Sequence, residues 1–134
     1  QTAILQPISL DVIGKNMGSI KRVTEDHSIV MELVRNGVIA EEDIRTHPLR
    51  NRITRCLGSL REDSADITWI DPNENDVLIL CSDGLWEMVH EDIILAVAHS
   101  SDSMEETCKR LIDAANDAGG ADNITVIAAR FQKN

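Results

Sequence analysis

The sequence predicts an α+β fold, a layered arrangement in which helices pack on a sheet, because strand-like and helix-like segments both recur along one chain. A length of 134 residues fits one domain. The strand candidates are residues 3–13, 19–23, 67–70, 77–81 and 124–131. The helix candidates are residues 27–36, 41–45, 91–99 and the segment that opens at Ser103 and closes before Gly119.

The strand predictions depend on apolar runs and on the turn residues between them. Residues 3–13 and 19–23 bracket Lys-Asn-Met-Gly at 15–18, a turn signal that predicts a hairpin. Residues 77–81 form a continuous apolar run, which is typical of a strand buried on both faces. We expect residues 124–131 to form another buried strand.

The helix predictions depend on apolar spacing and on capping residues. Apolar residues recur with helical period across 27–36, and Gly37 follows as a helix terminator. Ser103 and Glu106 form the pattern of a capping box, in which each side chain accepts a hydrogen bond from the other residue's backbone. Gly119 closes this last helix.

Composition excludes several classes of function. A formal net charge of −10 argues against binding to nucleic acid or to an anionic membrane, since both need basic patches. The three cysteines and four histidines lack the spacing of a zinc site, and free cysteines fit a reducing compartment. No apolar run is long enough to cross a bilayer. We therefore expect a cytoplasmic protein without a membrane segment.

Two aspartates lie at predicted strand ends. Asp83 directly follows the strand at 77–81, and Asp122 directly precedes the strand at 124–131. If these strands are antiparallel neighbours, both carboxylates project from one edge of the sheet within reach of one cation. Hard oxygen donors favour magnesium, manganese or calcium over zinc. Alternatively, both aspartates are ordinary turn residues.

Two neighbouring residues extend this pattern. Gly84 leaves room for a close approach of the backbone beside Asp83. Asn123 is placed to orient Asp122, or simply to satisfy the backbone of the turn. We expect Trp86 to fill the core beneath this site.

Several motifs in order resemble one phosphatase family. SDGLWE at 82–87 is followed by GGADNITV at 119–126. Upstream lie TEDHS at 24–28, LVRNG at 33–37 and HPLRNRITRCLG at 47–58. Together they resemble the C-terminal half of the metal-dependent serine/threonine protein phosphatases of type 2C, the PPM family, and look most like its bacterial members.

The resemblance covers about residues 20–131 and implies a layered β-sandwich flanked by helices, of which this chain holds the C-terminal part. It implies a flap-like segment at about 25–58 beside the catalytic cleft, and metal-site strands and helices over 67–134. In such a domain, Asp83 and Asp122 are ligands of a centre of two or more magnesium or manganese ions, which activates water as the nucleophile.

The same resemblance implies a hydrolase that removes phosphate from phosphoserine and phosphothreonine in phosphoprotein substrates, opposite a cognate serine/threonine kinase. Gly84 and Asn123 would then support the two metal ligands. Arg50, Arg52 and Arg55 are candidate phosphate contacts, or they pair with local carboxylates. For His47 we favour a structural role in a turn.

The chain also departs from the family pattern. Residues 1–30 contain no DGHGG-type element, which in the family supplies a bridging aspartate and the proposed general acid. Beyond the metal ligands we therefore identify no catalytic residue, and we expect a fragment that is inactive without the N-terminal half. The alternative is a non-catalytic, phosphatase-like interaction or regulatory module. An unrelated aspartate-based phosphohydrolase is disfavoured because its DxDx[TV] motif is absent.

Overall fold

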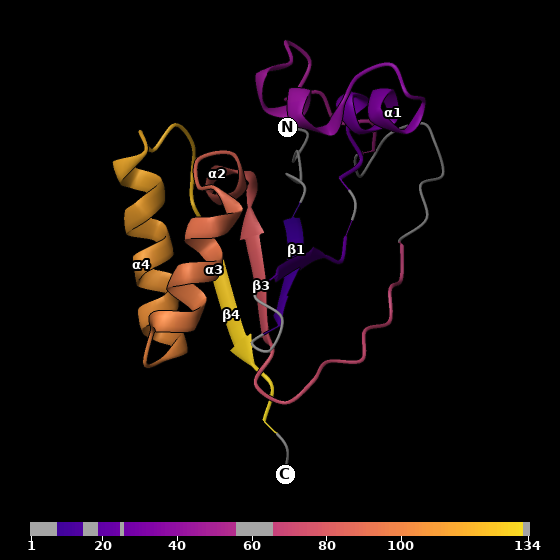
Figure 1. Ribbon diagram of the computed structural model, residues 1–134. Coiled ribbons are helices and arrows are strands. Elements are labelled where there is room, and N and C mark those ends of the chain that lie inside the picture. Colours follow the sequence, from indigo (N-terminus) through magenta and orange to yellow (C-terminus); the bar gives the residue numbers. More distant parts are fainter. Residues whose placement is uncertain (1–7, 15–18, 25, 56–65, 133–134) are drawn as a thin grey trace, which may run out of the picture. The chain divides into compact units, whose positions relative to one another are not determined.

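The computed structural model describes residues 8–14, 19–24, 26–55 and 66–132 (Figure 1). The chain divides into two compact units, which we treat separately: unit 1 is 1–7 with 25–67, and unit 2 is 8–24 with 68–134. The elements are β1 (Ile8–Gly14), β2 (Ser19–Arg22), α1 (Ile29–Arg35), the 3-10 helix η1 (Glu41–Thr46), β3 (Val77–Ser82), α2 (Asp83–Trp86), α3 (Glu91–Ser100), α4 (Met104–Asp117) and β4 (Val126–Arg130).

Unit 2 is built on a four-stranded sheet with the order β2-β1-β3-β4. All three neighbouring pairs are antiparallel. The predicted hairpin is confirmed for β1 and β2, while its turn and residues 3–7 lie outside the described residues. In β3 and β4, Cys81 pairs with Val126 and Val77 with Arg130, so the end of one strand meets the start of the other. The two strands are therefore antiparallel neighbours, as is required for Asp83 and Asp122 to lie at the same end of the strand pair.

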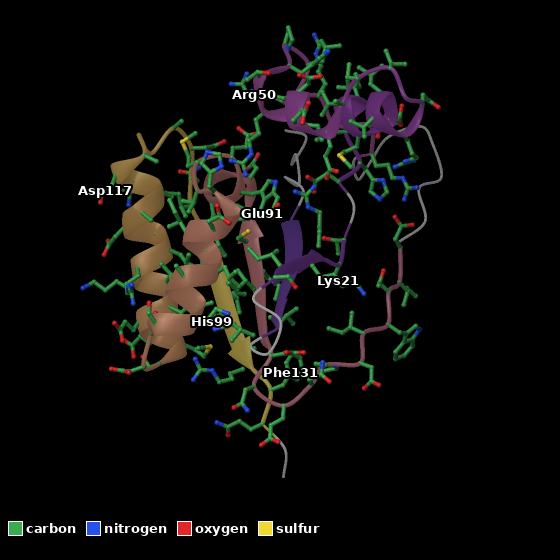
Figure 2. All side chains as sticks on the ribbon, in the orientation of Figure 1. Lys21, Arg50, Glu91, His99, Asp117 and Phe131 are labelled. Atoms are coloured by element: carbon green, nitrogen blue, oxygen red, sulfur yellow. The ribbon has the colours of Figure 1, made fainter. Side chains whose placement is uncertain are left out.

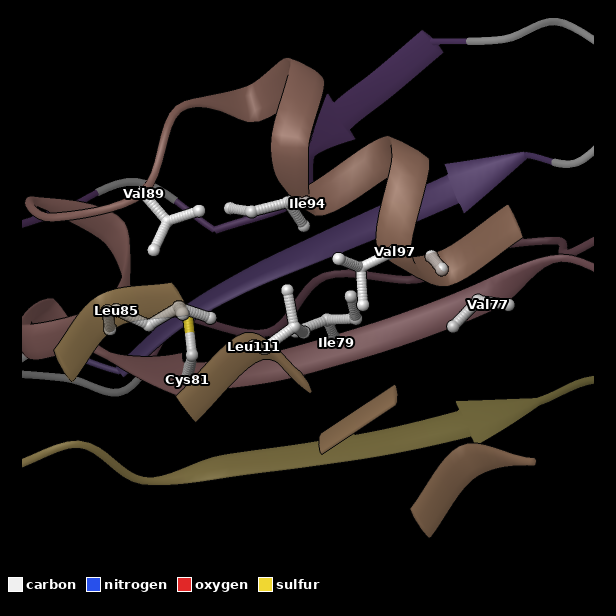
Figure 3. Packing of buried hydrophobic residues seen from close by; sticks show 10 residues of the cluster. Val77, Ile79, Cys81, Leu85, Val89, Ile94, Val97 and Leu111 are labelled. Carbon is white, nitrogen blue, oxygen red and sulfur yellow. The ribbon is translucent and has the colours of Figure 1, made fainter. Parts of the chain in front are cut away.

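Helices α3 and α4 lie side by side against the sheet and enclose the hydrophobic core (Figures 1 and 3). Alternate residues of β3 are buried in this core, namely Val77, Ile79 and Cys81. Leu85, Val89, Ile94, Val97, Ala98, Leu111 and Ala115 complete the buried set. Because aromatic residues are few, these aliphatic side chains supply most of the apolar burial that holds the helices on the sheet.

Two strand predictions need correction. β4 is an edge strand rather than a fully buried one: its residues alternate between half-buried and exposed, and Ile127 is 58% exposed. Residues 67–70 form no strand, and Trp69 is 91% exposed. Strand propensity describes side chains that fit a half-buried pleated surface, and the exposed side chains at 67–70 have no such surface. A turn at Glu74 and Asn75 precedes β3, with Asn75 at φ +70.

The predicted ends of the last helix, α4, are confirmed, but one hydrogen bond of the predicted capping box has a different backbone donor. Ser103 Oγ accepts a hydrogen bond from Glu106 N at 3.1 Å, as a capping box requires. The Glu106 carboxylate accepts from the backbone N–H of Asp102 at 3.1 Å, one residue before the predicted partner. At the other end Gly119 and Gly120 have positive φ, and Gly120 N donates to Ala115 O.

Unit 1 contains the predicted helix as α1 and the predicted short helix as the 3-10 turn η1. Ser28 caps α1, and Gly37 follows it at φ +68. An isolated bridge between Ser28 and Ile53 ties the start of α1 to the segment after η1. Across the part of the chain that the structure describes, no helix is both long and apolar enough to span a membrane.

Candidate metal centre

A serine at the end of β3 fixes the segment that leads into β4. Ser82 N donates to Thr125 O at 3.0 Å. The Ser82 hydroxyl donates to Asn123 O and accepts from Thr125 N, both at 3.0 Å. These three hydrogen bonds hold residues 123–125 beside the residue that precedes Asp83. The two predicted ligand segments are therefore joined at one edge of the sheet.

Gly84 brings the two segments into direct backbone contact. A Cβ atom at this position would lie 2.3 Å from the carbonyl oxygen of Asn123 and 3.0 Å from its carbonyl carbon. No side chain larger than hydrogen fits there without a shift of the backbone. The sequence-based expectation of a close approach at Gly84 is confirmed, and the neighbour is the backbone of Asn123.

Both aspartates accept a hydrogen bond from the backbone of the next residue. Asp83 is the first residue of α2 and is half-buried, and its Oδ1 accepts from Gly84 N at 3.0 Å. Asp122 is exposed, and its Oδ1 accepts from Asn123 N at 2.7 Å. Both donors are backbone N–H groups, so the orienting role of the Asn123 side chain stays a prediction. One oxygen of each carboxylate accepts a backbone hydrogen bond in this way, and carboxylate oxygens are also ligands for hard cations.

The donor chemistry of these segments fits a hard divalent cation. Carboxylate and carbonyl oxygens are the donors that magnesium and manganese take, and neither segment contributes a thiolate or imidazole. Among the described residues, no three or more His, Cys, Asp or Glu side chains gather as a metal-binding group. Two carboxylates supply only part of a six-coordinate shell. The role of Asp83 and Asp122 as ligands stays a prediction.

Trp86 is the last residue of the single turn of α2, and its ring is covered by Arg22, which lies outside the sequence motifs. It is half-buried and packs against the hydrophobic core, close to the expected position beneath the site. The guanidinium carbon of Arg22 lies 4.1 Å from the centroid of the Trp86 ring. Arg22 is the last residue of β2 and is remote from Trp86 in sequence, so no local spacing could have identified the pair.

The candidate phosphate-contacting arginines lie in unit 1, outside the unit that carries the aspartates. Arg55 lies 3.3 Å from both carboxylate oxygens of Asp66, so pairing with a local carboxylate is confirmed for this residue. His27 Nε2 lies 2.6 Å from Asp66 Oδ2. The hydrogen bond with His27, followed by that with Arg55, lowers the pKa of the Asp66 carboxyl below its ordinary value.

The other two arginines are exposed on a hydrogen-bonded turn. Figure 2 labels one of them, Arg50. Arg50 N donates to His47 O at 3.1 Å, and Arg52 N donates to Leu49 O at 3.0 Å. His47 Nδ1 accepts from Leu49 N at 3.1 Å, which confirms its structural role in the turn. Arg50 and Arg52 thus lie at the surface on a turn with a hydrogen-bonded backbone.

Comparisons with known proteins agree with this fold. The family model described as Stage II sporulation protein E (SpoIIE) matches residues 33–132. The serine/threonine phosphatase stp of Listeria welshimeri is 40% identical over 109 residues, which are 81% of this chain and 43% of that protein. The PPM serine/threonine phosphatase MsPP of Mycobacterium smegmatis, solved in complex with cacodylate, has a TM-score of 0.82 at 36% identity and covers 96% of this chain and 54% of that one.

A third relative was solved with metal. The catalytic domain of the serine/threonine protein phosphatase PstP, in complex with two manganese ions, has a TM-score of 0.75 at 26% identity and covers 94% of this chain and 51% of that one. The fold is thus the α+β fold of type 2C phosphatases, as predicted. The chain belongs to the PPM family of bacterial serine/threonine phosphatases. It spans about half the length of the relatives that it matches.

Proposed function

We propose that this chain supplies the C-terminal half of a metal-dependent phosphatase that hydrolyses phosphoserine and phosphothreonine in proteins. One observation carries the proposal: the hydrogen bonds of Ser82 and the contact at Gly84 join the Asp83 segment to the Asp122 segment at one sheet edge. Family membership supports it, because the site motifs at 82–87 and 119–126 both lie within the residues that the family model matches. We also propose that this half contains two parts, a flap-like segment at about 25–58 and a metal-binding part over 67–134.

In this proposal Asp83 and Asp122 hold magnesium or manganese within a binuclear centre. A divalent ion in such a centre lowers the pKa of bound water and stabilises charge on the phosphoryl oxygens. The contribution of the chain itself is orientation: Gly84 N and Asn123 N each fix one carboxylate oxygen, and Ser82 keeps the two segments in register. The relative solved with two manganese ions supports this choice of metal.

Substrate recognition is proposed for the exposed turn of unit 1. The guanidinium groups of Arg50 and Arg52 suit phosphate or acidic side chains of a phosphoprotein. Arg55 is held by Asp66, so a direct phosphate contact would require it to leave that carboxylate. A cytoplasmic serine/threonine kinase is the partner that would generate such substrates, and the reduced state of Cys81 and Cys108 suits that compartment.

A second candidate function is a non-catalytic interaction or regulatory module. The observation in its favour is the absence of a group of three or more metal-binding side chains among the residues that the structure describes. Two carboxylates bind divalent ions weakly, because affinity follows the number and rigidity of ligands. The two functions differ in one property, which is whether Asp83 and Asp122 bind a cation together.

Manganese binding and manganese-dependent turnover test the proposal directly. The loss of the free Mn²⁺ signal in electron paramagnetic resonance measures binding to the 134-residue chain, to Asp83→Asn and to Asp122→Asn. Asp113→Asn on the exposed face of α4 is the matched control. We expect both site variants to lose most of the wild-type affinity and the control to retain it. Equal affinity in all four proteins would disprove the metal site.

Hydrolysis of a phosphothreonine peptide is measured alongside binding. We expect Mn²⁺ binding without turnover, since two carboxylates form only part of a binuclear centre. Turnover that disappears in Asp83→Asn would show instead that the chain assembles a working site, through self-association. In that case the proposed need for an N-terminal half would be wrong.

A further inference from the structure

We propose that Arg22 and Trp86 form a positioning pair that holds the α2 turn so that Asp83 presents its carboxylate to the metal. The pair is defined by the 4.1 Å approach of the Arg22 guanidinium carbon to the Trp86 ring centroid. It connects the last residue of β2 with the last residue of the turn that begins at Asp83. The inference depends on the proposed metal site.

The α2 turn needs external anchors because it is too short to be stable by itself. It contains four residues, and nucleation of a helix is unfavourable in isolation. Within the turn, Glu87 N donates to Asp83 O at 2.8 Å, so Asp83 moves with the turn as one unit. The orientation of the Asp83 carboxylate therefore depends on the contacts that fix the turn as a whole.

Several contacts anchor this turn, and three of them involve the residues that directly follow Asp83. Leu85 is fully buried in the core, and Gly84 lies against the backbone of Asn123. Trp86 packs partly on the core and partly under the Arg22 guanidinium. The first two contacts restrict translation of the turn, and the broad indole ring resists its rotation about the chain axis. Arg22 covers that ring and so keeps it in place.

An arginine suits this role better than other cations. Its planar guanidinium stacks on an aromatic face, which an ammonium group does not do. Arg22 is half-buried, whereas its neighbour Lys21 is exposed, as expected for successive residues that point to opposite faces of a sheet (Figure 2). Lys21 is therefore a matched control on the same strand.

The positive charge of Arg22, taken by itself, would weaken metal binding at Asp83, whereas the proposed positioning role strengthens it. A guanidinium beside the α2 turn repels a divalent cation held by Asp83, so removing its charge should tighten Mn²⁺ binding. If the arginine acts by positioning, removing it should weaken Mn²⁺ binding instead. The sign of the change in affinity therefore separates the two roles, and a purely structural role would lower stability without changing the affinity of the folded protein.

The experiment uses Trp69→Phe as the background. The chain has two tryptophans, and Trp69 is 91% exposed, so this change leaves Trp86 as the only indole reporter. Mn²⁺ affinity is measured by electron paramagnetic resonance and Trp86 emission by fluorescence in Arg22→Met, Arg22→Lys and Lys21→Met. Loss of a group that orients a metal ligand lowers affinity by about 10- to 100-fold, and we expect about tenfold for Arg22→Met.

We expect Arg22→Met to change the Trp86 emission spectrum, Arg22→Lys to restore part of the affinity, and Lys21→Met to match the background protein. Unchanged or tighter binding in Arg22→Met would overturn the inference, as would an equal loss in Lys21→Met. If Arg22→Met does not fold, Trp86→Phe keeps an apolar ring while weakening the stack, and wild-type affinity in that variant would overturn the inference.

Failure of the proposed function has a different signature. If the background protein and its Asp83→Asn variant bind Mn²⁺ equally, the metal site is wrong and the positioning role fails with it. If Asp83→Asn loses affinity while Arg22→Met keeps it, the metal site stands and the positioning role alone is disproved.

Discussion

Replacement of Gly84 by alanine tests the contact that joins the two halves of the candidate site. Gly84 is not among the glycines with positive φ, so alanine can adopt its backbone conformation. The penalty comes from contact alone, because the new Cβ would lie 2.3 Å from Asn123 O. An ordinary C···O contact is about 3.3–3.6 Å, so the two segments must separate by roughly 1 Å.

That separation has a cost that can be estimated. The hydrogen bonds of the Ser82 hydroxyl to Asn123 and Thr125 are 3.0 Å long, and a further 1 Å or so would break them. Forcing an extra methyl group into a packed site costs about 1–3 kcal/mol, and each lost hydrogen bond costs about 1 kcal/mol. With both hydrogen bonds lost, we therefore expect Gly84→Ala to lower the free energy of unfolding by about 3–5 kcal/mol.

Urea unfolding followed by circular dichroism measures this change, with Mn²⁺ affinity determined on the same samples. Gly37→Ala is the control: Gly37 has φ +68 and nothing lies within 4 Å of its built Cβ, so it reports backbone strain without a clash. Left-handed backbone costs an alanine about 1–2 kcal/mol, and Mn²⁺ affinity should not change. If Gly84→Ala destabilises the chain no more than Gly37→Ala and keeps wild-type Mn²⁺ affinity, the described contact does not shape the site.

Two further predictions concern caps and titration. Ser103→Ala removes the hydroxyl that accepts from Glu106 N and should lower the free energy of unfolding by about 1 kcal/mol in urea, whereas no measurable loss would argue against the cap. In an NMR pH titration the Asp66 carboxyl should titrate below the ordinary aspartate pKa of 3.8, and His27→Gln should raise that midpoint. Because the folded pKa is the lower one, stabilisation by Asp66 is present above pH 3.8 and is lost as the pH falls through the folded pKa. An unchanged midpoint in His27→Gln would contradict this assignment.

The parts of the site that could be predicted from sequence are those encoded locally. The apolar run at 77–81 predicts a strand that ends just before Asp83, and β3 spans Val77–Ser82. The second aspartate follows a helix-terminating glycine pair, which places it before β4. Pairing of the two strands was an assumption, and the register of β3 and β4 confirms it.

The parts that could not be predicted depend on tertiary partners. Residues 67–70 have the composition of a strand but are exposed, because strand composition does not specify a pairing partner. Glu106 satisfies Asp102 rather than its predicted partner, since two adjacent backbone donors lie within reach of one long side chain. The contact between Arg22 and Trp86 joins β2 to α2, and only the folded sheet brings those two elements together.

The rigid part of this chain lies directly behind the candidate ligands, which bears on how the two proposed functions differ. Leu85, two residues after Asp83, is fully buried together with Leu111 of α4. The Ser82 hydroxyl accepts a hydrogen bond from Thr125 N and so links this buried region to the segment before β4. In the proposed site, the orientation of the two aspartates therefore comes largely from unit 2, and the number of ligands would limit the affinity for a cation. A chain that supplied further carboxylates would raise the cation affinity without reorganising this edge of the sheet. Half of a phosphatase requires such a preformed edge, whereas a module that only binds proteins does not.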